Sequence, residues 1–205
     1  FVLLMATVPF YTKYALRIPE EQSTFLLGAT FLMVFLTLAW WMRYTVKVGP
    51  KRAMSTGIIL FAVTILPFAV AKGLAMGIAC GALLGIGLAG LILLFDVLLA
   101  DVIDEDQVRT GRRREGMYFG ANALFIRLGV SAQALVMSQV LKASGYNPHL
   151  AVQPPSVEIG IRFLMAGVPV IALALAYLVL RMYPLYGETL AGIKRELAER
   201  RGRIE

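Results

Sequence analysis

The chain has 205 residues, of which 59% are hydrophobic and 16% are charged, and its net charge is +7. Soluble domains contain about 45–50% apolar and about 25% charged residues, so this composition excludes an ordinary soluble fold. A single cysteine, Cys80, and a single histidine, His149, exclude a disulfide framework and a metal site built from Cys or His. We therefore expect an integral membrane protein without a metal site.

Six apolar runs follow one another along the chain, and each predicts a helix, because a bilayer span needs about 20 mostly apolar residues. In chain order the runs are Phe1–Leu16, Thr24–Met42, Ala53–Ala71, Gly73–Ala100, Gly116–Leu141 and Ile159–Met182. The first run is short, which suggests that residue 1 is a cut in a longer protein. The predicted fold is all-α, a polytopic transmembrane bundle over residues 1–183, followed by a basic tail over residues 184–205.

Three prolines, Pro9, Pro67 and Pro169, fall inside these runs. Membrane helices tolerate proline because neighbouring groups satisfy the carbonyls that it frees, so we expect kinks and not breaks. In the tail, residues 193–203 combine apolar and basic positions. We expect a short amphipathic helix there, at the membrane surface.

The positive charge is distributed unevenly between the two sides of the predicted bundle. Fourteen of the 20 basic residues fall within 43–52, 109–114 and 181–203, whereas the opposite connections carry five and Arg127 lies inside a span. By the positive-inside rule the first side is cytoplasmic, as are both ends of the chain. The charge therefore reports membrane orientation, and a nucleic-acid partner is not expected.

Glycines are concentrated in the fourth apolar run. Residues 85–90 match the pattern G-x-G-x-x-G, but that pattern binds dinucleotides only between a strand and a helix, and here it lies mid-membrane. Gly73, Gly77, Gly81 and Gly85 recur every four residues and form a small-residue face that lets another helix approach closely. This face is suited either to static packing or to a sliding, gating contact.

The fifth run is the most polar, and it supplies the candidate substrate-binding residues Tyr118, Asn122, Arg127 and Ser131. At 100° per residue, Arg127 and Ser131 share one stripe, while Tyr118 and Asn122 share the opposite one. Arg127 lies about 16 Å along the helix, near the bilayer centre. A charge at that depth costs at least about 2.5–3.5 kcal/mol and by default marks a pathway or binding site. The alternative is a structural arginine bonded to helix carbonyls.

Charged residues of both signs surround the turn between the fourth and fifth runs. We expect an inner gate, here called the cytoplasmic charge cluster, that comprises Asp101, Asp104, Arg113, Glu115, Lys51 and Arg52. The alternative is ordinary anchoring with solvated carboxylates, whose pairs contribute about 0–1 kcal/mol each. Asp96 lies about 9 Å shallower than Arg127, so the two are not expected to pair directly.

Residues 100–116, ADVIDEDQVRTGRRREG, precede a polar helix and a tail that begins Tyr183-Pro184-Leu185. This pattern resembles the glycoside-pentoside-hexuronide:cation symporters, the melibiose-carrier branch of the major facilitator superfamily. The resemblance covers all six runs and corresponds to the C-terminal half of a twelve-helix carrier. It implies that Asn122 takes the place of an amide that lines the sugar cavity, and Arg127 that of a lysine near the sugar and cation sites.

The same resemblance implies that Asp101, Arg113, Lys51 and Arg52 belong to a charged network at the cytoplasmic face. Ile92 stands where the melibiose carrier has a sugar-stacking tryptophan, which argues against melibiose-like recognition. The coupling cation, Na⁺ or H⁺, is held mainly by the N-terminal half, which is absent from this sequence. No other cofactor is implied.

The predicted function is cation-coupled symport of a sugar, glycoside or hexuronide by alternating access, in the plasma (bacterial inner) membrane. The expected partners are the lipid bilayer, a small polar solute and the N-terminal six-helix half. The alternatives are a carrier of lysolipid or another amphiphile, and a non-transporting membrane scaffold. An enzyme is not expected, because the sequence contains neither H-E-x-x-H nor G-x-S-x-G.

Overall fold

In the computed structural model, which describes residues 1–150 and 152–202, every apolar run is helical. The first run forms α1 (Val2–Phe10) and η1 (Tyr11–Leu16), and a short 3-10 turn, η2 (Glu20–Gln22), leads to the next helix. The remaining elements are α2 (Ser23–Val48), α3 (Pro50–Ile65), η3 (Leu66–Ala69), α4 (Gly73–Thr110), α5 (Glu115–Ala143), α6 (Pro155–Arg162), η4 (Phe163–Gly167), α7 (Val168–Arg181) and α8 (Gly187–Gly202).

Within the described residues, five helices are long and apolar enough to cross a membrane. Two of these are composite, since α3 continues into η3, and α6, η4 and α7 form one helix over Pro155–Arg181. A shorter apolar helix, Val2–Leu16, precedes them. The predicted all-α fold of apolar, membrane-capable helices is thereby confirmed, and the first run is helical but shorter than a span.

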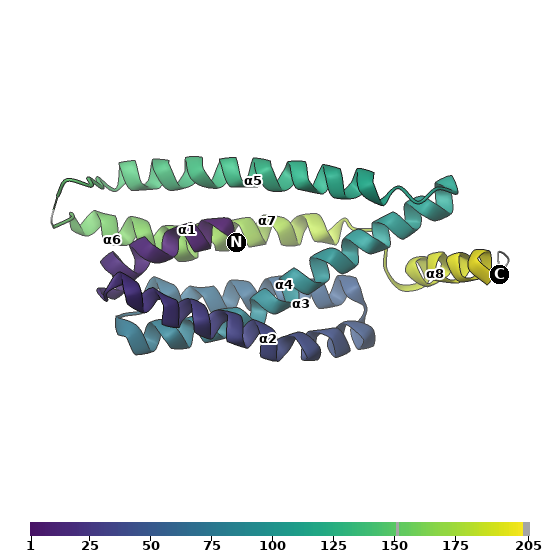
Figure 1. Cartoon of the computed structure of the whole chain (residues 1–205), viewed down its shortest axis with the longest axis horizontal. Coiled ribbons are helices and arrows are strands. Elements are labelled where there is room, and N and C mark those ends of the chain that lie inside the picture. The colour runs from purple at the N-terminus through teal and green to yellow at the C-terminus, as the bar shows by residue number, and fades with distance from the viewer. Residues whose placement is uncertain (151, 203–205) are drawn as a thin grey trace.

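The helices run roughly along one axis, and their turns collect at two ends of the bundle (Figure 1). One end holds the α2–α3 turn, the α4–α5 turn and α8, and is called the tail end below. The helices α2, α3 and α4 pack together, and α3 also contacts α7. Helix α5 lies along the upper edge of the molecule in Figure 1, and α1, α6 and α7 lie between it and the group formed by α2 and α3.

The small-residue face of α4 packs against α2 at backbone distance. A Cβ at Gly81 would lie 2.9 Å from the Leu26 carbonyl oxygen, and one at Gly85 only 2.3 Å from that of Thr30. Both distances are too short for any residue larger than glycine without movement of α2. Gly73 is different, because it starts the helix at φ +70° and has open space around it. The predicted close helix approach is confirmed from Gly81 to Gly85.

The remaining glycines of the G-x-G-x-x-G pattern also serve helix packing. A Cβ at Gly87 would lie 2.7 Å from Cα of Phe61 on α3. At Gly90 the indole of the fully buried Trp41 fills the same space, 2.6 Å from an added Cβ, and its Nε1 donates a 2.7 Å hydrogen bond to the Ile86 carbonyl. The glycines of this pattern therefore let α2 and α3 pack closely against α4, and they lie within a helix and not on a strand-to-helix turn.

Each intramembrane proline lies in or beside a segment of altered helical hydrogen bonding. The π-helix η1 follows Pro9, the 3-10 helix η3 contains Pro67, and the π-helix η4 ends two residues before Pro169. Proline removes an N–H donor and crowds the carbonyl four residues earlier, and the hydrogen-bond spacing departs from the α-helical pattern near each of these prolines. The helices continue through Pro9 and Pro169, as predicted for distortions and not breaks.

The tail helix α8 begins earlier than expected, at Gly187, and Arg203 of the predicted helix lies outside the described residues. Its apolar residues Ile193 and Leu197 are buried with Leu185 against Val102 and Val108 of α4. The expected helix is present and docks on α4, which continues ten residues beyond Ala100 and offers an apolar surface there. Its place at the membrane surface stays a prediction.

Candidate functional site

The polar helix α5 is the least enclosed of the spans. None of its residues is buried, although its middle contains polar side chains and an arginine. It contacts α1, α6 and α4, and its C-terminal end is fixed to α6, where the Ser156 hydroxyl donates a 2.8 Å hydrogen bond to the Ser144 carbonyl. The helix therefore presents most of its surface, polar positions included, away from the described bundle.

The candidate substrate residues all lie on this helix. The side chain of Arg127 is exposed, and no carboxylate of the described residues pairs with it. The Ser131 hydroxyl donates to the Arg127 carbonyl at 3.2 Å, so it is satisfied within the helix. Tyr118 and Asn122 are half-buried. An intramembrane guanidinium without a partner is costly in lipid, so Arg127 must face water or protein when the chain is in a membrane.

Asp96 of α4 is also exposed, and no ion pair joins it to Arg127. The absence of a direct pair agrees with the difference in depth deduced from the sequence. Both charges thus lie within apolar helices without a partner among the described residues. Such groups are rare in membrane proteins and usually line a cavity or pair with another element.

At the tail end, the turn between α4 and α5 is closed by ion pairs that include three residues of the cytoplasmic charge cluster. The Arg113 guanidinium lies 3.3 Å from Asp104, 2.9 Å from the side-chain oxygen of Gln107 and 2.5 Å from Glu115. Arg114, which the sequence did not single out, forms a bidentate pair with Asp106. Arg113 and Arg114 thus each make two or more charge-assisted contacts across one turn. Such contacts hold α4 and α5 together more firmly than single exposed ion pairs do.

Asp101 has a different partner, from the tail helix. Its Oδ1 lies 3.2 Å from Nζ of Lys194, its side chain is only 4% exposed, and Oδ2 has no hydrogen-bond partner among the described residues. The neighbouring Tyr183 hydroxyl donates to the Leu98 carbonyl at 3.3 Å. Burial, with the nearby Asp101 and Glu105 carboxylates, raises the pKa of Tyr183, so this hydroxyl keeps its proton.

Lys51 and Arg52 do not reach these carboxylates. Nζ of Lys51 donates to the carbonyls of Arg181 and Tyr183, at 3.1 and 2.5 Å, and lies 4.1 Å from the centroid of the Tyr186 ring. It thus caps the C-terminal end of α7, where the helix dipole favours a cation. Arg52 is exposed and forms no ion pair with a described residue.

Sequence reasoning missed a second charged centre, at the end opposite the tail. Arg162 is 13% exposed and donates to the carbonyls of Phe68, Ala69 and Ala15, at 3.3, 3.0 and 3.1 Å. It also pairs with Glu158, 3.0 Å away, which in turn pairs with Arg17. The i,i+4 spacing of Glu158 and Arg162 was a usable signal, but the carbonyl partners come from helices distant in sequence.

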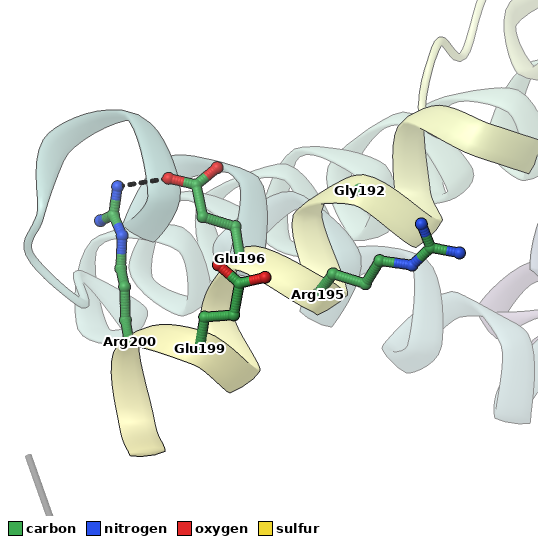
Figure 2. Close-up of a pocket in the computed structure, with 5 residues that line it drawn as sticks. All are labelled: Gly192, Arg195, Glu196, Glu199 and Arg200. Atoms are coloured by element: carbon green, nitrogen blue, oxygen red, sulfur yellow. Dashed lines mark hydrogen bonds and ion pairs between the residues drawn. The ribbon is translucent and has the colours of Figure 1, made fainter. Parts of the chain in front are cut away.

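The hollows at the tail end are of two kinds. One, on the outer side of α8, is about 570 Å³ and is lined by charged side chains (Figure 2). There Arg200 pairs with Glu196 at 2.6 Å, while Arg195 points away from both. The other hollow, about 750 Å³, lies between the α2–α3 turn and α8. In the described part of the chain, no group of three or more His, Cys, Asp or Glu side chains is placed to hold a metal ion.

Residues 1–187 match the family described as MFS/sugar transport protein. The chain belongs to this family. It is a family of transporters and not of enzymes, and its members are integral membrane proteins. Membership confirms the superfamily part of the resemblance found in the sequence, whereas the match does not distinguish a melibiose-carrier branch.

Relatives of this MFS chain carry symporter names. The sodium-dependent lysophosphatidylcholine symporter 1 of Gallus gallus is 26% identical over 98% of this chain. The putative glycoside/cation symporter YagG of Escherichia coli is 29% identical over 51% of the chain, and the uncharacterized symporter sll1374 of Synechocystis is 27% identical over 57%. The alignments cover 38%, 23% and 22% of these relatives, so the chain spans well under half of their length.

Proposed function

We propose that this chain forms the C-terminal six-helix half of a symporter driven by Na⁺ or H⁺, with α5 facing the transport pathway. The observation that carries the proposal is the exposed, unpaired Arg127 at mid-length of an apolar helix with no buried residue. In a complete carrier, an N-terminal half covers this surface and encloses a polar cavity. The excess of basic residues at the tail end supports a cytoplasmic location for that end, in a plasma (bacterial inner) membrane.

The proposed substrate is a sugar, glycoside or hexuronide, and the proposed cavity-lining residues are Arg127 and Ser131 on one stripe of α5 and Asn122 and Tyr118 on the opposite stripe. Arginine offers a planar fork that binds carboxylates in a bidentate manner and stays charged at all physiological pH values. A hexuronide supplies the matching carboxylate. The amide of Asn122 and the hydroxyl groups of Tyr118 and Ser131 are suitable hydrogen-bond partners for sugar hydroxyls.

A lysolipid is the second candidate substrate, because the lysophosphatidylcholine symporter of Gallus gallus aligns with 98% of the chain. The phosphate of a lysolipid satisfies the Arg127 fork as well as a carboxylate does. The two candidates differ in the rest of the molecule, since an acyl chain needs an apolar path. Exposed apolar residues of α5 beside Arg127, such as Phe125 and Leu128, supply such a surface.

The charge pairs at the tail end are proposed to act as an inner gate. Arg113 joins Asp104 and Glu115 across the α4–α5 turn, and Asp101 joins Lys194. In an alternating-access transporter, a ligand shifts the equilibrium between two states only if it binds one of them more tightly. The free energy needed to open the gate pairs must therefore be comparable to the difference in ligand-binding free energy between the two states. The exposed Arg113 pairs, at about 0–1 kcal/mol each, meet this condition, whereas the Asp101–Lys194 pair has a buried carboxylate and costs more to break.

The test is uptake by vesicles that contain the full-length protein. Three labelled solutes, a galactoside, a hexuronide and lysophosphatidylcholine, are compared under an inward Na⁺ gradient, an inward H⁺ gradient and no gradient. We expect gradient-driven uptake of one class, abolished by Arg127→Ala and partly kept by Arg127→Lys. Arg195→Ala, on the exposed face of the tail helix, is the matched control and keeps wild-type uptake.

Each outcome has a distinct meaning. Uptake of lysophosphatidylcholine alone selects the second candidate. An Arg127→Ala protein that transports like wild type rejects the assignment of this residue to the pathway. If none of the three solutes enters under either gradient, the sugar and lysolipid assignments both fall and the protein is better described as a membrane scaffold.

A further inference from the structure

A basic groove lies at the tail end, between the α2–α3 turn and the tail helix. Its volume is about 750 Å³, and its polar lining consists of Lys47, Lys51, Arg52, Ser55, Tyr186 and Lys194. None of the described residues that line it is acidic. Four cationic side chains thus converge on one hollow, supplied by the end of α2, the start of α3 and one face of α8.

Two of the four cationic side chains are bound to groups of the protein, and the other two are not. Lys51 is engaged with the carbonyls of Arg181 and Tyr183, and Lys194 with Asp101. The side chains of Lys47 and Arg52 are exposed and have no ion pair or hydrogen-bonded partner among the described residues. The first pair therefore fixes the walls of the groove, while the second pair is available to an external anion.

Two helix N-termini add to the positive potential. Gly49 and Pro50, at the start of α3, line the groove, as does Gly187 at the start of α8. The first turn of a helix has N–H groups without intrahelical partners and carries a partial positive charge, which favours anions. No side chain caps α3. The acid in the first turn of α8, Glu188, is not part of the groove lining.

The groove lies at the end of two helices that are long and apolar enough to cross a membrane, since α2 ends at Val48 and α3 begins at Pro50, and both residues line it. Val46, next to Lys47, is 89% exposed, and Met182, at the end of α7, is 82% exposed. Both lie at the ends of helices that are long and apolar enough to cross a membrane. Basic residues that directly follow such helices attract anionic lipid headgroups, and a phospholipid in this groove can place its phosphate on the cations and its acyl chains along the apolar helices, which a soluble anion cannot do.

From this arrangement we infer that the groove binds the phosphate headgroup of an anionic phospholipid of the adjacent leaflet, through Lys47 and Arg52. The bound headgroup lies in the groove between the α2–α3 turn and the tail helix. The inference concerns a peripheral lipid and is independent of what the proposed pathway along α5 carries.

The experiment measures lipid binding to the purified full-length protein in detergent by native mass spectrometry. Phosphatidylglycerol and phosphatidylcholine of the same acyl length are titrated in parallel. Wild-type protein is expected to prefer phosphatidylglycerol. Each basic residue near anionic lipid contributes about 1 kcal/mol, so the double variant Lys47→Gln/Arg52→Gln should bind phosphatidylglycerol about 30-fold more weakly.

Matched variants separate this site from general charge effects and from misfolding. Lys72→Gln/Lys142→Gln removes the same charge at the opposite end and should change the affinity less than twofold. Lys47→Arg/Arg52→Lys keeps the charges and should bind like wild type. Equal affinity for the two lipids, or equal losses in both Gln variants, overturns the inference. If millimolar inorganic phosphate displaces phosphatidylglycerol from the wild-type protein, the groove is a free-anion site and the lipid assignment is rejected.

Discussion

The ammonium group of Lys194 lies 3.2 Å from Oδ1 of Asp101, and this contact ties the tail helix to the end of α4. The carboxylate is 4% exposed, whereas the lysine side chain is 53% exposed. The buried charge of Asp101 therefore depends on Lys194 for its stabilisation, whereas the charge of Lys194 is stabilised by water. Removal of one residue is expected to have a different effect from removal of the other.

Replacing Lys194 by alanine should destabilise the tail end, because it leaves a buried carboxylate unpaired. Because water still reaches the lysine position, we expect a loss of about 1–3 kcal/mol, less than for a fully buried pair. Limited trypsin digestion should then cleave α8 several-fold faster. The double variant Asp101→Asn/Lys194→Met should recover much of the loss. Arg195→Ala serves as control, and if it has the same effect as Lys194→Ala, the ion pair is not the cause.

Gly85→Ala should disrupt the contact between α4 and α2. Its Cβ would lie 2.3 Å from the Thr30 carbonyl oxygen, so the two backbones must separate. We expect a loss of about 1–3 kcal/mol, measured as a lower midpoint of thermal unfolding in detergent. Gly192→Ala, on the tail helix with open space around it, should instead be neutral or stabilise by up to about 1 kcal/mol. A Gly85→Ala protein as stable as wild type would show that α2 adapts freely.

Trp41→Phe should weaken the same helix packing through a different interaction. The substitution keeps an aromatic ring but removes the Nε1 donor to the Ile86 carbonyl and leaves a small void beside Gly90. The expected cost is about 1–2 kcal/mol. Trp40→Phe is the matched control, because Trp40 is 50% exposed, and it should cost less than half as much. Equal unfolding midpoints for the two variants would contradict the assigned role of Trp41.

Arg162→Gln should loosen the end of the bundle opposite the tail. It removes donors to carbonyls at the ends of η1 and η3 and leaves Glu158 without its nearer partner. The expected loss is about 2–3 kcal/mol, and Arg162→Lys should recover only part of it, because one ammonium group cannot span both helix ends. Arg17→Gln, which removes a single pair from a 79% exposed side chain, should cost at most about 1 kcal/mol. Comparable losses in both Gln variants would refute this assignment.

Hydrophobicity predicted which segments form helices but not how far each helix extends. The fourth run, read as Gly73–Ala100, continues to Thr110 because Asp101–Thr110 is helical although it is charged. A criterion based on apolar length stops where the membrane stops, whereas backbone hydrogen bonding stops only at Gly111, which has φ +69°. The extension explains why the tail helix has an apolar surface to pack against.

The sequence identified several residues of the candidate site, but few of the contacts that these residues make. Arg127 could be found because a lone charge in an apolar run is unusual. The carbonyl partners of Lys51 and Arg162 could not be found, because they belong to helices far away in sequence and a residue pattern carries no information about backbone carbonyls. Asp101 was grouped with the charges nearest in the predicted loops, yet its partner Lys194 comes from the tail.

One unbroken helix, α4, carries both the glycine contacts within the bundle and the charged end on which α8 docks (Figure 1). At 38 residues it is about 57 Å long, nearly twice the thickness of the hydrocarbon core. The tail helix therefore docks on the same continuous backbone that α2 crosses at Gly81 and Gly85, so a displacement of α4 at that crossing would carry the tail helix with it.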